Sequence, residues 1–169
     1  MKTSPFSRRN GLLGLVSAGV VFIAVASSGY GGGALAVDPP LAVFVGTESP
    51  LSDISRSALR RAFLGEPTVV EGVKLLPLNQ NPGTPDRIRF DKGALDLLPD
   101  AVSRFWIDQR IRGEGNPPRS IPSVELLLKL ASHLPGVIAY ARITDVPPGS
   151  VKILTIDGKK PGAPGYLLN

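Results

Sequence analysis

The sequence VKLLPLNQNPGTPD, residues 73–86, decides how this chain is expected to fold. Its first part, Val73 to Leu78, is mostly apolar and predicts a buried strand, and the polar run from Asn79 to Pro85 predicts a turn-rich segment after it. Thr84 can cap a helix that starts with Pro85, and Asp86 suits the positive end of the helix dipole. We therefore expect a strand, a glycine-containing turn and a helix that runs toward Leu97.

Strands and helices are expected to alternate on both sides of this stretch. The sequence predicts further strands at 41–46, 137–141 and 151–156, and helices at 55–64, 99–112 and 124–134, with a Gly/Pro loop over 113–122. The last helix is the clearest, because Val124, Leu127, Leu128 and Ala131 follow helical spacing. This order predicts an α/β fold with a small mixed sheet flanked by helices.

The first 36 residues have the order of charged, apolar and small residues that a secretory signal peptide has. Lys2, Arg8 and Arg9 precede an apolar stretch, and Ala34-Leu35-Ala36 is a small-residue cleavage pattern. We expect cleavage after Ala36 and one mature domain over 37–169. A retained membrane anchor is the alternative, and the paired arginines leave the twin-arginine and general secretory routes both open.

The composition of the predicted mature chain excludes several function classes. Removing residues 1–36 leaves 133 residues with 16 basic and 14 acidic side chains, so the domain is nearly neutral. A nearly neutral domain gives no electrostatic reason to expect nucleic acid as a partner. The chain has no cysteine, so disulfides are excluded and a hydrophobic core has to stabilise the fold.

Catalytic and metal-binding chemistry is poorly represented. His133 is the only histidine, and its position at the end of a predicted helix favours contact with unpaired carbonyls or water over catalysis. One histidine without cysteine cannot supply a usual zinc site. We therefore expect no enzyme activity, no metal and no cofactor.

Four aspartates follow the central turn at intervals of four to five residues: Asp86, Asp91, Asp96 and Asp100. This spacing scatters their carboxylates around a helix instead of bringing them together. We interpret them as a solvated face.

The turn that ends Gly83-Thr84-Pro85 is the one feature with binding chemistry. Backbone N–H groups of a glycine-containing turn that runs into a helix form a geometry that binds anions without a charged side chain.

Several segments resemble phosphate-type periplasmic substrate-binding proteins of ABC transporters. Residues 58–65, Ala-Leu-Arg-Arg-Ala-Phe-Leu-Gly, are similar to the "L-x-x-I-F-L-G" helix end of that family, and the loop ending Gly83-Thr84 is similar to its "R-x-x-G-S-G-T" anion loop. Residues 105–113 and 135–140 resemble the "W … G" and "P-G-A-I-G-Y" segments of short members. The resemblance covers most of residues 41–156 and implies a single periplasmic-binding-protein-like lobe.

The chain departs from this family at two positions of the anion loop. The arginine of the motif falls on Leu78 and its serine falls on Pro82, so only Gly83 and Thr84 match. Asn79, Gln80 and Asn81 could donate hydrogen bonds instead. Three arginines, Arg87, Arg89 and Arg112, either compensate by folding over the loop or are surface charges.

The resemblance implies a non-enzymatic periplasmic domain that binds phosphate or a related oxyanion weakly in ABC-type transport or sensing. The candidate ligand-binding residues are Asn81, Gly83, Thr84, Gln80 and Arg87. Expected partners are a membrane permease, a sensor or a second binding lobe, and the oligomeric state is left open. The alternative is an envelope protein-interaction module that keeps the scaffold without binding a ligand, as the residues at 78 and 82 suggest.

Overall fold

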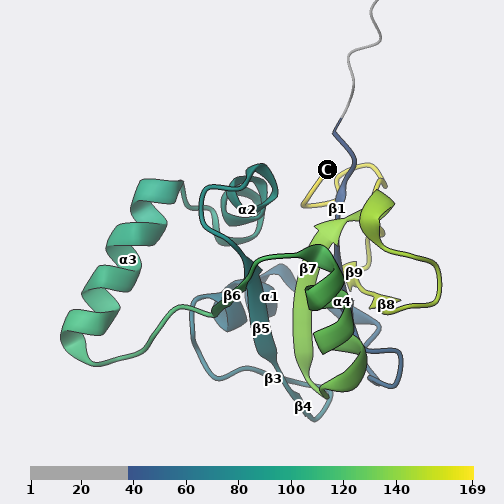
Figure 1. Ribbon diagram of the computed structural model, residues 1–169, viewed down its shortest axis with the longest axis horizontal. Helices are drawn as coiled ribbons and strands as arrows, with labels where there is room; N and C mark the ends of the chain where they lie inside the picture. The colour runs from purple at the N-terminus through teal and green to yellow at the C-terminus, as the bar shows by residue number, and fades with distance from the viewer. Residues whose placement is uncertain (1–37) are drawn as a thin grey trace, which may run out of the picture. The chain divides into compact units, whose positions relative to one another are not determined.

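The computed structural model describes residues 38–169, which contain a five-stranded mixed sheet flanked by helices (Figure 1). The predicted signal peptide lies outside the described residues. The strands lie in the order β6-β5-β7-β1-β8. Their bounds are β1 Leu41–Val45, β5 Leu76–Gln80, β6 Arg119–Ile121, β7 Val137–Arg142 and β8 Lys152–Ile153. Strand β5 is parallel to β6 and β7, whereas β1 is antiparallel to β7 and β8.

Alternate side chains of β1 and β7 point to opposite faces of the sheet, and both faces are buried. Val43 and Tyr140 belong to one hydrophobic cluster, and Phe44 and Ala139 belong to the other. Strand β1 is buried along its whole length. The unbroken apolar run from Leu41 onward is therefore a buried strand, at the expected position in the chain.

Helices cover the two faces of the sheet. Helix α4, Val124–His133, packs on the face that carries Phe44, whereas α1, Arg56–Phe63, packs on the face that carries Tyr140 (Figure 1). Both helices begin as the sequence predicts. The side chains of Ser55 and Ser123 accept hydrogen bonds from the first-turn amides of α1 and α4, each at 3.2 Å.

The predicted helix after the central turn is present in two parts. Helix α2 spans Pro85–Phe90 and continues as a π-helical turn over Asp91–Leu95, which ends at Asp96 with φ +56°. The next helix, α3, spans Pro99–Arg112 and ends at Gly113 with φ +69°. Glycine is favoured at such a left-handed position because it has no Cβ.

The expected strands at 73–78 and 151–156 are both divided. A hairpin of β3, Val69–Val70, and β4, Val73–Lys74, precedes β5, and β9, Thr155–Ile156, leaves the main sheet to pair with β2, Asp53–Ile54. The hairpin turn has positive φ at Glu71 and Gly72, +48° and +79°, as a type I′ turn requires. The expected loop 113–122 is also wrong in part, since it contains the edge strand β6.

Trp106 attaches α3 to the rest of the fold. Its ring lies against Gly65, where an added Cβ would be 2.9 Å from the ring, and the Gly65 φ of +86° also favours glycine. Val102 is buried beside Trp106, whereas much of the remaining helix surface is exposed. Among residues 38–169, no helix has the length and apolar character that spanning a membrane requires.

Candidate oxyanion site

The candidate site lies at the corner where β5 ends and α2 begins. Asn81 and Gly83 are exposed in the connecting turn, and Gly83 has φ +84° with open space around its Cα. Thr84 precedes Pro85 as expected, but its hydroxyl does not cap the helix. Both the amide and the hydroxyl of Thr84 donate to the Asn81 carbonyl, at 3.4 and 3.0 Å. The donors of Thr84 are therefore occupied within the turn.

Asn79 and Gln80 were expected in the turn but are buried residues of β5. The Gln80 side chain donates to the Tyr140 carbonyl at 3.2 Å, and the Asn79 Oδ1 accepts from the Tyr140 hydroxyl at the same distance. Burial raises the pKa of Tyr140, so the phenol stays protonated and can donate. Pairing with β6 at Asn79 and Gln80 extends the strand past Leu78, whereas β7 pairs with the start of β5. The Gln80 side chain is thus held inside the fold and does not reach the turn.

Arg87 is a buried residue and not a surface charge. Its side chain is 7% exposed, and Nε donates to both carboxylate oxygens of Asp91, at 2.8 and 2.7 Å. Its Nη1 donates to the Gln80 carbonyl at 3.3 Å. Arg87 therefore folds back under the turn that precedes α2, and its charge is balanced by Asp91.

Two of the four aspartates contradict the interpretation as a solvated face. Burial raises the pKa of Asp91, and the Arg87 guanidinium opposes that shift. Asp86 is also buried and accepts two hydrogen bonds from Arg142 Nε, at 2.8 and 3.0 Å. The spacing of the aspartates could not reveal the partner of Asp86, because Arg142 lies 56 residues away in the sequence.

The other two arginines behave differently from Arg87. Arg89 is half-buried and donates to the Pro39 carbonyl at 3.0 Å, whereas Arg112 is exposed and lies 3.9 Å from Glu114. Neither lines the cavity beside the turn. Arg112 is the surface charge that one of the two interpretations expects.

A cavity of about 270 Å³ separates the turn from α3. Gly83, Arg87 and Asp91 line one side, and α3 supplies the other side. The remaining lining residues are Pro82, Ile88, Pro99, Val102, Ser103, Trp106, Ile107, Arg110, Pro117, Pro118 and Ser120. Most of this wall is apolar, and its charged groups are two arginines and one aspartate.

Three of these lining residues could not be assigned to a site from the sequence. Ser103 and Arg110 lie two turns apart on α3, and Ser120 lies on β6, a strand in the segment expected to be a loop. Their spacing on α3 allows one helix face to hold both Ser103 and Arg110. Nothing in the sequence says that this face looks toward the turn.

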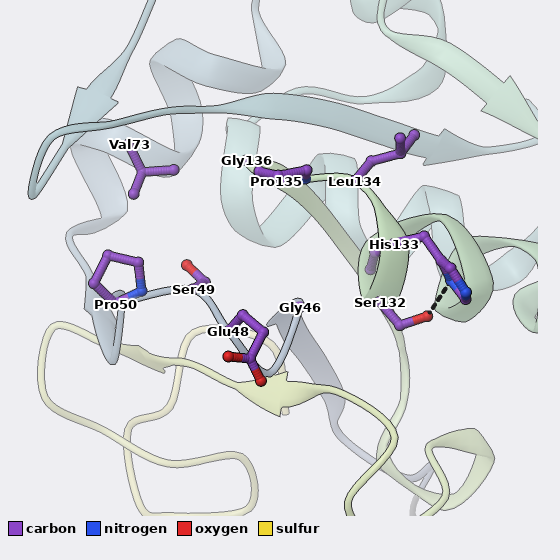
Figure 2. Close-up of a pocket in the computed structure, with 11 residues that line it drawn as sticks. Gly46, Glu48, Ser49, Pro50, Val73, Ser132, His133, Leu134, Pro135 and Gly136 are labelled. Carbon is purple, nitrogen blue, oxygen red and sulfur yellow. Dashed lines mark hydrogen bonds between the residues drawn. The ribbon is translucent and has the colours of Figure 1, made fainter.

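A second cavity, of about 250 Å³, lies at the end of α4, and His133, the only histidine of the chain, is one of its lining residues (Figure 2). His133 Nδ1 lies 2.8 Å from the Lys129 carbonyl and 2.9 Å from Ser132 Oγ. A carbonyl can only accept, so Nδ1 carries the proton and cannot act as a base for Ser132. His133 contacts a last-turn carbonyl, as predicted, and Glu48 lies on the separate loop after β1.

The described part of the chain offers no cluster of three or more histidine, cysteine, aspartate or glutamate side chains that could hold a metal ion. Asp86 and Asp91 are each paired with an arginine. What the corner between β5 and α2 can do chemically is to present an arginine edge and an open backbone turn to a small anion.

Comparison with known proteins gives a likeness in fold. No family model matches the chain, and no curated protein matches it. An ABC-type phosphate transport receptor from Vibrio cholerae superposes with a TM-score of 0.57 at 16% sequence identity, over 73% of this chain and 48% of the receptor. A protein from Clostridium perfringens, assigned as a phosphate ABC transporter substrate-binding protein and solved with bound phosphate, gives a TM-score of 0.54 at 13% identity.

This chain spans about half the length of the proteins that it resembles, since the match covers 48% and 47% of their chains. The mixed sheet, its flanking helices and the corner after β5 all lie within residues 38–169. The described part of the chain therefore has the fold of phosphate-type ABC transporter substrate-binding proteins, over about half of their length.

Proposed function

We propose that this chain is a non-enzymatic solute-binding-like domain that binds phosphate or a related oxyanion weakly, for ABC-type transport or sensing. The observation that carries this proposal is the position of Arg87. Its buried guanidinium lines a cavity next to the exposed turn at Gly83, although the arginine expected at position 78 is missing. The fold shared with phosphate transport proteins supports the same function.

The affinity follows from the small number of free donors. Asp91 balances the charge of Arg87, and both donors of Thr84 are bonded to Asn81. A charge-assisted hydrogen bond contributes about 1.5–3 kcal/mol. One or two such bonds support millimolar binding, which corresponds to about 4 kcal/mol, and not micromolar binding at about 8 kcal/mol.

Tighter capture requires a second wall over the turn at Gly83. The proteins of similar fold are about twice as long as the part that this chain matches. We propose that a second lobe, a permease or a sensor supplies that wall. The exposed turn residues Asn81 and Gly83 are the ones that such a partner would cover.

We further propose that the chain works outside the cytoplasm after export. The support is the residue pattern of 1–36, with Ala34-Leu35-Ala36 as its cleavage signal. Amino-terminal sequencing of protein recovered from a bacterial periplasm tests this point. We expect the exported chain to start at Val37, and recovery with Met1 in the membrane fraction would contradict cleavage.

Isothermal titration calorimetry with phosphate and with sulfate tests the binding function. We expect saturable binding in the millimolar range, with a Kd of about 1 mM. The variant Arg110→Ser removes a positive charge from the cavity wall and is expected to weaken binding, whereas Arg112→Ser removes an equal charge from outside the cavity and is the matched control. Absence of heat at millimolar ligand would contradict the oxyanion function.

The second candidate function is an envelope protein-interaction module, and the exposed apolar side chains of α3 favour it. Ile111 is 78% exposed, and Ile107, one turn earlier on the same helix, is 47% exposed. Exposed apolar side chains that lie together mark contact surfaces. A specific envelope partner recovered in the absence of added anion, and lost with Ile111→Asp, would support the module over the oxyanion function.

A further inference from the structure

The cavity between α2 and α3 differs from a site built for a bare inorganic anion. Its walls are mainly proline and aliphatic side chains, with Ile88 on α2 and Ile107 on α3. Polar inorganic anions lose hydration against such walls and receive no hydrogen bonds in return. The wall therefore suits a ligand that carries apolar surface of its own.

The charges that line the cavity add up to a single positive charge. Arg87 and Arg110 are positive and Asp91 is negative, and no other lining residue is ionisable. Asp91 accepts hydrogen bonds from Arg87 Nε, and the Gln80 carbonyl accepts one from Nη1. Among the described residues, no hydrogen-bond partner is found for Arg87 Nη2. A ligand with one negative charge would match this balance.

Hydrogen-bonding groups lie around the same cavity. The hydroxyls of Ser103 and Ser120 line it, and Ser103 Oγ donates to the Pro99 carbonyl at 3.0 Å, which leaves its lone pairs free to accept. Trp106 is 6% exposed, and its Nε1 is a buried donor with no partner within residues 38–169. A few polar groups in a mostly apolar wall are typical of small-molecule sites.

We propose that the cavity takes a small organic anion, with one carboxylate-like charge at Arg87 and Arg110 and an apolar body against Trp106 and Ile107. This inference rests on the proposed oxyanion function and names the class of its ligand. The volume of about 270 Å³ is just below the roughly 300 Å³ at which drug-sized pockets begin, so the body is about the size of one ring.

The chain carries its own reporter for this site, because Trp106 is its only tryptophan and lines the cavity. Tryptophan emission is followed while the purified protein is titrated with 3-phenylpropionate, with the uncharged 3-phenylpropan-1-ol and with inorganic phosphate. We expect 3-phenylpropionate to bind at least about tenfold more tightly than either of the other two, a difference of about 1.4 kcal/mol.

The outcomes of this titration distinguish the organic-anion inference from the proposed oxyanion function. Phosphate that binds as tightly as 3-phenylpropionate overturns the organic-anion inference and leaves the oxyanion function standing. The alcohol binding as tightly as the acid also overturns the inference, because the charge then contributes nothing. No response to any of the three, with no heat in calorimetry, overturns both.

Two substitutions on α3 locate the site. Ile107→Asp places a negative charge in the cavity wall and is expected to weaken 3-phenylpropionate binding about tenfold or more. Ile111→Asp places the same charge one turn further along, outside the lining, and should leave binding unchanged. Both positions are exposed, so both variants should fold, which circular dichroism checks. Equal loss in the two variants would contradict binding in this cavity.

Discussion

Arg87 lies four residues before Asp91, and its Nε donates to both oxygens of that carboxylate at 2.8 and 2.7 Å. Both side chains are buried, at 7% and 5% exposure. The pair connects α2 to the π-helical turn that follows it, and its arginine also reaches the Gln80 carbonyl at the end of β5. One ion pair therefore sets the geometry of the corner and leaves an arginine edge on the cavity.

The single substitutions Arg87→Leu and Asp91→Leu should each destabilise the fold by about 3–5 kcal/mol, because each leaves a buried charge without a partner. The double variant should recover most of that loss, since it buries no charge. Urea unfolding of the wild type, the two single variants and the double variant gives the coupling free energy between the two side chains. Additive losses in the double variant would show that the two side chains do not stabilise each other.

Gly136 should tolerate substitution far less than Gly72, although both have positive φ, +82° and +79°. An added Cβ at Gly136 would lie 2.3 Å from the Lys74 carbonyl oxygen, whereas nothing lies within 4 Å of one at Gly72. Gly72→Ala should therefore cost about 1–2 kcal/mol from backbone strain alone.

Gly136→Ala should exceed that cost clearly, because the clash is with backbone atoms that cannot turn away. Chemical denaturation of both variants provides the measurement. Equal costs would mean that β4 and the start of β7 can separate without penalty.

Stability should fall at alkaline pH as Tyr166 loses its proton. Burial raises the pKa of Tyr166 from 10.0 to about 12, and its hydroxyl donates to the Leu41 carbonyl at 2.9 Å. Because the folded pKa is the higher one, this contribution is complete below pH 10 and is lost as the pH rises toward 12.

Tyr166→Phe should therefore flatten the decline of unfolding free energy between pH 10 and 12. The raised pKa of Tyr140 leaves part of the decline in place, which makes the difference between wild type and variant the informative quantity. Identical pH profiles for the two proteins would contradict the assignment to Tyr166.

Local sequence patterns predicted much of the fold, because the determining interactions are local. The apolar run at Leu41 and the helical spacing of Leu127 and Ala131 both act within a few residues. The α/β class and the small sheet followed from the order of these elements.

Long-range contacts account for the parts that the sequence did not reveal. Pairing with β6 draws Asn79 and Gln80 into β5, although asparagine favours turns. The short strand β6 has prolines on both sides and reads as a loop until a neighbour provides its hydrogen bonds. The turn at Glu71-Gly72 is local, and its glycine indicates a hairpin in the sequence as well.

The candidate site was predictable only in its location. Gly83 and Arg87 do line the cavity beside the turn, but the contribution of α3 depends on the packing of Trp106 against Gly65. That contact joins residues 41 positions apart and has no local pattern. The burial of Arg87 likewise depends on the end of β5 and not on α2 alone.

Nuclear magnetic resonance of ¹⁵N-labelled protein titrated with phosphate tests the central claim most directly. The account predicts dose-dependent shifts, in the millimolar range, of the Gly83 amide, the Arg87 Nε–H and the Trp106 indole N–H, all of which belong to residues that line one cavity. Signals that stay unchanged at those three groups, or shifts confined to residues elsewhere in the fold, would contradict oxyanion binding at the corner between β5 and α2.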